Sequence, residues 1–182
     1  MKGLVFTEFL EMVEHTFSAD TVDDIIDAAD LASGGAYTSV GTYPHAEMVT
    51  LVKNLSKQTG ISVPDLIKTF GHYLFERFVV LYPRFFTNSP DAFDFLDSIE
   101  KHVHVEVRKL YPDAELPTFD TLREGTQKLI MIYRSQHPFA SLAEGLIEGC
   151  LAHYQVNANI VPVDRSAGQG THVEFHITRV TV

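Results

Sequence analysis

The hydrophobic pattern of this 182-residue chain changes its period at Pro117. Before Pro117, apolar residues recur at three- and four-residue spacing, which is typical of helices that bury one face. After it, apolar and polar residues alternate over most segments, which is typical of antiparallel strands. Because helices come first and strands last, the sequence predicts an α+β fold and not an alternating βαβ array.

Helix ends are marked by residues that favour caps and breaks. Gly60 follows an amphipathic segment at a C-cap position, and Ser62 with Pro64 suits the start of the next helix. Thr21 followed by Asp24 resembles a capping arrangement. We therefore expect helices at residues 4–16, 21–29, 47–59 and 62–78, with an irregular connector at 37–43.

The alternating patterns after Pro117 predict four strands and one more helix. The alternation is clear in the last strand, where polar residues separate Val173, Phe175 and Ile177. A glycine-containing turn at residues 166–170 is expected to join the last two strands. The predicted strands span residues 119–123, 127–133, 157–163 and 171–182, and the predicted helix spans residues 140–154.

Length and composition limit the class of protein. With 45% hydrophobic residues, the chain is expected to form one domain over 1–182, with a helical subdomain at about 1–62 and helices plus an antiparallel sheet at 63–182. No apolar run is long enough for a membrane span, and a secretory leader pattern is missing. The net charge of −10 argues against nucleic acid and anionic membranes as partners. We expect a cytoplasmic protein, and the lone Cys150 excludes a thiolate-rich zinc site.

A long helix is predicted between Asp91 and Pro112, and it carries two histidines. At 100° per residue, His102 and His104 project about 200° apart, so one should be buried and the other should face water. The periodicity favours His104 slightly. A single histidine beside an apolar face is more often a hydrogen-bonded core residue than a metal ligand. The apolar stripe of this helix consists of Leu96, Ile99, Val103, Val107 and Leu110.

An aromatic segment precedes this helix. Such clusters are more often ordinary core than a cofactor pocket, although this density suits a large, flat, apolar ligand better than a polar substrate. The aromatic residues are Phe70, Tyr73, Phe75, Phe78, Tyr82, Phe85 and Phe86.

The spacing His-x6-Tyr-Pro from His104 to Pro112, followed by Tyr133-x-Ser135, resembles the H-NOX family of haem nitric oxide/oxygen-binding domains. Met1-Lys2-Gly3, Phe70-Gly71 and residues 143–147 extend the resemblance over essentially the whole chain. The resemblance implies a sensor and not an enzyme. It also implies haem b (iron protoporphyrin IX) held between the two subdomains, with His104 as the proximal iron ligand.

A haem needs apolar walls and groups that hold two propionates. By resemblance, Tyr133 and Ser135 belong to the propionate-binding Tyr-x-Ser-x-Arg motif, but His137 stands at the arginine position. Histidine is charged only part of the time near pH 6.5, so anchoring is expected to be weaker or pH-dependent. Strand alternation points Arg134 to the other face. The residues expected to line the haem face opposite His104 are Val5, Phe9, Leu74, Phe78 and Leu142.

The distal position implies a ligand preference. Oxygen binders of this family place a tyrosine over the iron, where this chain has Leu142, with Phe9 and Leu74 at the supporting positions. None of these side chains donates a hydrogen bond, and bound dioxygen needs a donor. The resemblance therefore implies a sensor of nitric oxide that also binds carbon monoxide and excludes oxygen.

The resemblance also implies how a signal forms. Nitric oxide weakens the bond to His104, and Pro117 and Val5 match residues that distort the haem in the family. Release is expected to free the long helix and rotate the helical part against the sheet part. The expected partner is a histidine kinase or a cyclic-di-GMP enzyme.

Two other readings of the residues stay open. One is a small non-haem metalloenzyme that uses His102, His104, His172 and His176, but residues i and i+4 of a strand lie about 13 Å apart, too far to share one ion. The other is a purely structural interaction module whose histidines are all hydrogen-bonded.

Overall fold

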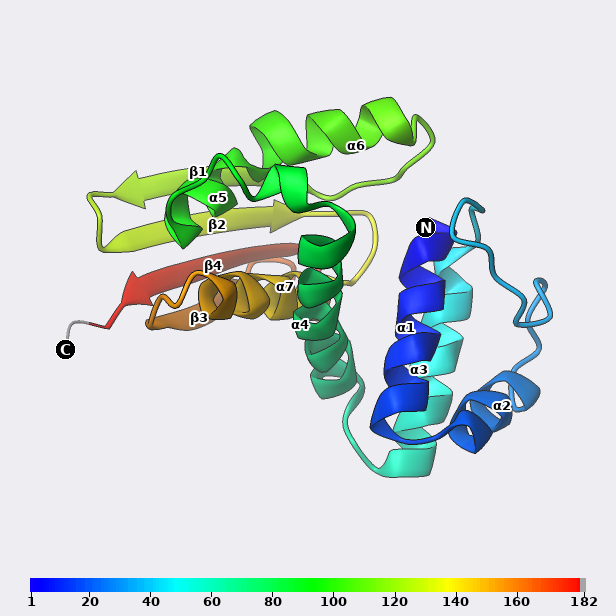
Figure 1. The fold of residues 1–182 in the computed structure, drawn as a ribbon. Coiled ribbons are helices and arrows are strands. Elements are labelled where there is room, and N and C mark those ends of the chain that lie inside the picture. Colours follow the sequence, from blue (N-terminus) through cyan, green and yellow to red (C-terminus); the bar gives the residue numbers. More distant parts are fainter. Residues whose placement is uncertain (181–182) are drawn as a thin grey trace.

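The computed structural model describes residues 1–180, and its elements follow the predicted order of helices and then sheet (Figure 1). Residues 181–182, the end of the predicted strand 171–182, lie outside the described residues. In Figure 1 the fourth helix stands between the N-terminal helices and the sheet. The first four helices are α1 (Gly3–Thr16), α2 (Ala19–Asp27), α3 (His45–Thr59) and α4 (Val63–Leu81).

Serine side chains start two of these helices. The Ser62 hydroxyl accepts a hydrogen bond from the Asp65 N–H at 3.2 Å, as the sequence predicts for the start of α4. In α2 the cap is Ser18, whose hydroxyl accepts from the Thr21 N–H at 3.1 Å. The predicted cap at Thr21 is therefore wrong, and α2 begins two residues earlier.

The connector between α2 and α3 is fixed by a buried carboxylate. Glu47 is 6% exposed and accepts hydrogen bonds from the Ser33 N–H at 3.2 Å and the Tyr37 hydroxyl at 2.7 Å. Burial alone would raise the pKa of Glu47, but the hydrogen bonds from Ser33 and Tyr37 lower it overall. An ionised side chain thus holds the irregular segment against the helices.

The long helix predicted from Asp91 to Pro112 contains a π-helical turn. A π turn holds more residues than an α turn, so it rotates the second half of the helix relative to the first. The predicted apolar stripe is therefore wrong at its end, where Leu110 is 60% exposed while His104 is buried and 9% exposed. The three parts, end to end, are α5 (Ala92–Ser98), the π turn (Ile99–Val103) and α6 (His104–Leu110).

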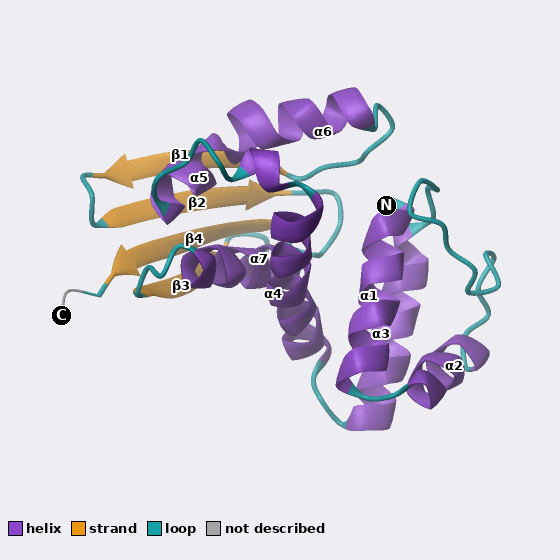
Figure 2. Cartoon of the chain, viewed as in Figure 1, coloured by secondary structure: helices purple, strands orange, loops and turns teal. Residues whose placement is uncertain are grey.

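A four-stranded antiparallel sheet follows, in the order β1-β2-β4-β3 (Figure 2). The four strands and their direction are as predicted, but the order is not that of a simple meander. Between β2 and β3 the chain forms α7 (Ala140–His153), and β3 then takes the outer edge while β4 pairs with β2. The strands are β1 (Thr118–Glu124), β2 (Lys128–Arg134), β3 (Ala158–Asp164) and β4 (His172–Arg179).

Two hydrophobic cores meet at α4. The alternating side chains Met131 and Phe175, which pair across β2 and β4, are buried in the core of the sheet together with residues of α5 and α7. Leu74 of α4 belongs to the core of the N-terminal helices, whereas Phe75, the next residue, belongs to the sheet core. The α4 helix therefore faces both cores. No helix within residues 1–180 is long and apolar enough to span a membrane.

Glycines bring α4 and α7 into backbone contact. A Cβ atom added at Gly71 would lie 2.4 Å from the Leu142 carbonyl oxygen, and one added at Gly145 would lie 2.0 Å from the Lys68 carbonyl oxygen. Both distances are below any real contact, and both partners are backbone atoms that cannot move aside alone. The close crossing of α4 and α7 therefore requires glycine, which has no side chain, at positions 71 and 145.

Gly145→Ala should lower the free energy of unfolding by about 1–3 kcal/mol, the usual effect of overpacking. Urea denaturation should show this as a lower midpoint. Ser141→Ala on the same helix is the control, because it adds no atom next to α4. Equal midpoints for the two variants would contradict the backbone contact, since alanine favours a helix over glycine where space permits.

Candidate functional site

An apolar cavity lies where the start of α1, the C-terminal half of α4, α6 and the first turns of α7 meet the end of β2. Its volume is about 300 Å³, at the lower end of the roughly 300–1,000 Å³ typical of ligand pockets. Aliphatic and aromatic side chains form most of its wall, which suits a large apolar ligand. The polar side chains among the lining residues are Lys2, Tyr82, His104, Tyr111, Glu115, Tyr133, Ser135 and His137.

His104 lines this cavity as the first residue of α6, immediately after the π turn. Its Nδ1 lies 2.9 Å from a carboxylate oxygen of Glu100. An ionised carboxylate only accepts, so Nδ1 carries the proton and Nε2 keeps its lone pair. Burial lowers the pKa of His104, although Glu100 opposes that shift. The lowered pKa favours the neutral imidazole, which is the form that binds a metal.

Glu100 is held by two further donors. Its Oε1 accepts from Arg108 at 2.8 Å, and its Oε2 also accepts from the Phe119 N–H at 3.2 Å. Burial raises the pKa of Glu100, but hydrogen bonds from Arg108 and His104 lower it overall. Glu100 and Arg108 were not among the site residues predicted from the sequence. The available signal was their spacing, because Glu100 precedes His104 by four residues and Arg108 follows it by four.

The predicted lining residues lie in the cavity wall, with one exception. Phe9 is fully buried in the core of the N-terminal helices, where its ring packs edge to face on Phe70 at 5.2 Å between centroids. Phe9 lies one helical turn after Val5 and is not among the lining residues. The expectation that Phe9 lines the cavity is therefore wrong. The predicted residues in the wall are Val5, Leu74, Phe78, His104, Pro117, Tyr133, Ser135, His137 and Leu142.

The residues of the Tyr-x-Ser-x-His motif build one polar end of the cavity. The Tyr133 hydroxyl donates to the His137 carbonyl oxygen at 3.1 Å, and the His137 N–H donates to Ser135 Oγ at 3.0 Å. These bonds close the turn that follows β2 and hold His137 at the cavity wall. Arg134 forms an ion pair with Asp120, and it is not among the lining residues.

Two neighbours of His137 were missed by the sequence analysis. The His137 Nε2 lies 3.1 Å from Glu115, and the His45 ring lies 3.8 Å from the His137 ring between centroids. The pKa of His45 is lowered by burial, by His137 and by the amino terminus of Met1, and Glu115 opposes that shift. No local pattern joins residues 45, 115 and 137, so only the fold brings them together.

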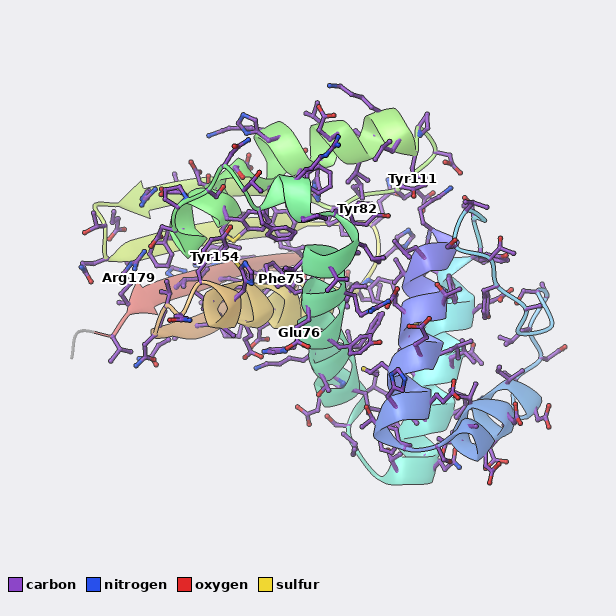
Figure 3. All side chains as sticks on the ribbon, in the orientation of Figure 1. Phe75, Glu76, Tyr82, Tyr111, Tyr154 and Arg179 are labelled. Carbon is purple, nitrogen blue, oxygen red and sulfur yellow. The ribbon has the colours of Figure 1, made fainter. Side chains whose placement is uncertain are left out.

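A pair of phenols lines another part of the cavity. Tyr82 and Tyr111 lie close together near the ends of α4 and α6 (Figure 3). Burial raises the pKa of Tyr82 to about 12, and the neighbouring phenol of Tyr111 adds to that shift. The sequence analysis counted Tyr82 only among the aromatic residues and missed it as a possible donor in the cavity.

The histidines of the alternative metal site lie apart from any ligand set. His176 Nε2 lies 3.2 Å from Glu174, and His172 and His176 are on β4. Within residues 1–180, no three His, Cys, Asp or Glu side chains come together as a group that could hold a metal ion. In the described part of the chain, the four histidines of the non-haem alternative therefore form no metal site.

A protein-family model described as haem-NO-binding matches residues 2–161 of the chain. The chain is similar to the H-NOX protein from K. algicida in its Fe(II) unliganded form, with 41% identity over 100% of this chain and 98% of that chain and a TM-score of 0.94. It is also similar to the H-NOX from Shewanella woodyi in its Fe(II)CO state with IWP-051 bound. There the identity is 39% over 99% and 95% of the two chains, and the TM-score is 0.84.

A third structure, an H-NOX protein from S. oneidensis in the Fe(II)NO state, has 22% identity over the full length of both chains and a TM-score of 0.90, which shows the shared fold. No curated protein matched the chain by sequence. Given the family match and the two structures near 40% identity, the chain belongs to the haem-NO-binding, or H-NOX, family. H-NOX domains are sensor domains and not enzymes, and their cofactor is haem.

The residues of the cavity fit a haem. The cavity has a mostly apolar wall, and His104 lies in that wall. Glu100 contacts Nδ1 of His104, so Nε2 is left for a metal. The polar groups of Tyr133, Ser135 and His137 gather at one end. A flat apolar ring with two carboxylates has the same division of apolar and polar parts.

Proposed function

We propose that this chain is a sensor of nitric oxide in which His104 is the proximal ligand of a ferrous haem b. The observation that carries the proposal is the Glu100 contact to Nδ1, which leaves Nε2 as the ligand atom in an apolar cavity. When bound, the haem would supply a ferrous iron that can be held by a histidine nitrogen and can bind a diatomic gas. The S. oneidensis and S. woodyi relatives were solved with nitric oxide and carbon monoxide, which supports both gases as ligands.

The wall opposite His104 is proposed to select the gas. Leu74 and Leu142 line the cavity and have no polar atom in their side chains. Nitric oxide and carbon monoxide bind ferrous haem without a donor, whereas dioxygen gains negative charge and needs one. We infer that these residues exclude oxygen.

Tyr133, Ser135 and His137 are proposed to hold the haem propionates, with His45 beside them. A carboxylate at this end would meet the imidazoles of His137 and His45 and compete with Glu115 for them. The amino terminus of Met1 is near enough to shift the pKa of His45 and adds positive charge. A histidine can replace the permanent positive charge of an arginine only while its imidazole is protonated.

The signal is proposed to begin with displacement of His104 and α6. After α6 the chain reaches Asp113, which accepts hydrogen bonds from Lys2 at 3.1 Å and from Thr42 at 2.6 Å. Movement of α6 would therefore act on the proposed helical subdomain, residues 1–62, and rotate it against residues 63–182. Val5 and Pro117, both in the cavity wall, are proposed to distort the haem before release.

The proposed reader of this change is a cytoplasmic partner, either a histidine kinase or a cyclic-di-GMP enzyme. The single, buried Cys150 suits a reducing compartment. A ligand shifts the two conformations only by its differential affinity for them. The surface that the partner contacts must therefore differ between the states before and after His104 is displaced.

Replacing His104 by glycine should remove the iron ligand and abolish the absorption band of the histidine-ligated haem. Added imidazole should restore that band, because it can occupy the space left by the side chain. His102→Gly is the control, since His102 is exposed and should leave the spectrum unchanged. A native spectrum in His104→Gly without imidazole would refute the ligand assignment, and a colourless native protein would favour a structural module.

The ferrous protein should bind nitric oxide and carbon monoxide but should form no stable complex with oxygen in air. Leu142→Tyr supplies a donor and should slow the release of oxygen, by about tenfold if the new hydrogen bond contributes about 1.4 kcal/mol. Visible spectra after mixing with oxygen measure the effect. A stable oxygen complex in the native protein that disappears in Tyr82→Phe would identify Tyr82 as the donor and contradict the exclusion proposal.

His137→Arg should slow the transfer of haem to an acceptor apoprotein by at least about tenfold at pH 8, because a charge-assisted hydrogen bond contributes about 1.5–3 kcal/mol. In the native protein, haem loss should accelerate as pH rises and His45 loses its proton, which happens at a lower pH than usual because burial lowers the pKa of His45. His72→Arg, outside the cavity, is the control. A pH-independent native rate would contradict the role of the histidines.

A further inference from the structure

The carboxylate of Glu100 is shared by donors from two other parts of the fold. Glu100 belongs to the π turn, His104 and Arg108 belong to α6, and Phe119 belongs to β1. Oxygen Oε2 accepts from His104 at 2.9 Å and from the Phe119 N–H at 3.2 Å, while Oε1 accepts from Arg108 at 2.8 Å. A carboxylate that accepts from three donors keeps its negative charge.

The charge of this carboxylate acts through the ring of His104. A negative acceptor at the Nδ1 proton pulls that proton outward and raises the electron density at Nε2. Nε2 then becomes a stronger donor to a ferrous iron than a histidine bonded to a neutral carbonyl group. Glu100 is 29% exposed at its side chain, so water weakens this effect only in part.

Arg108 acts on the same carboxylate in the opposite sense. Its guanidinium draws negative charge towards Oε1, away from the oxygen that accepts from His104. Arg108 is 43% exposed, and it reaches Glu100 across two turns of the helix. Glu100 and Arg108 therefore have opposing effects on the imidazole of His104, and neither side chain is among the residues that line the cavity.

We propose that Glu100 is a positioning residue that strengthens the bond from His104 to iron, and that Arg108 limits this strengthening, so that the pair sets how readily nitric oxide displaces His104. The inference rests on the proposed function, in which His104 is the ligand. The Phe119 N–H holds the carboxylate at β1, so Glu100 stays in place as an acceptor while α6 moves.

Resonance Raman spectra of the ferrous, haem-loaded protein test the proposal directly, through the iron–histidine stretching band. Glu100→Gln keeps the shape and an acceptor oxygen but removes the charge, so the band should move to lower frequency. Arg108→Gln leaves the carboxylate charged and should move the band to higher frequency. Glu106→Gln is the matched control, because Glu106 is exposed on α6, pairs with Lys109 and should leave the band unchanged.

The same variants should shift the response to the gas. With nitric oxide added, the fraction of protein that has lost the bond to His104 should rise in Glu100→Gln and fall in Arg108→Gln. Haem transfer to an acceptor apoprotein should be about tenfold faster in Glu100→Gln, at the lower end of the usual effect of removing an outer-shell partner. A purely structural role for Glu100 could accelerate haem loss, but it would not give band shifts of opposite sign.

Two outcomes overturn the inference and separate it from the proposed function. If the spectrum depends on His104 but the band is unmoved in Glu100→Gln, or moves in the same direction in both variants, the inference alone fails. If His104→Gly keeps the native spectrum, the proposed ligand is wrong and both fail together.

Discussion

The site depends on holding one imidazole neutral and in one orientation inside an apolar cavity. Burial of His104 favours the neutral ring, but a buried ring N–H without an acceptor would be costly. Glu100 supplies the acceptor, and its own charge is in turn offset by Arg108 and by the Phe119 N–H. A buried charge without such partners would destabilise the fold. The proposed iron ligand, His104, is therefore positioned by the π turn, α6 and β1 together.

The sequence predicted features that depend on neighbours along the chain. The change of period at Pro117 gave the order of helices and strands, and Ser62 and Gly60 marked helix ends, because caps act within one turn. The π turn was missed, since it changes the number of residues per turn without any residue that signals it. It matters because it lies directly before His104, which is buried while His102 is exposed.

Features that depend on distant residues could not be predicted in the same way. The strand order follows from the path of α7, and the contact of His45 with His137 joins residues 92 positions apart through the fold. Glu100 is an intermediate case. Its spacing from His104 was visible, but a charged residue beside an apolar stripe usually faces water, so its role became clear only from the contacts of its carboxylate.

The contacts around the cavity differ in how easily they can change. The α4 and α7 backbones touch at Gly71 and Gly145, where any sliding would bring backbone atoms into collision. In contrast, the chain after α6 is linked to the N-terminal part through Asp113, which is 58% exposed and pairs with Lys2 and Thr42, and an ion pair with a solvent-exposed partner contributes about 1 kcal/mol or less. A ligand supplies only a few kcal/mol of differential binding. The proposed signal therefore runs through α6, because a ligand is better able to move α6 than to separate α4 from α7.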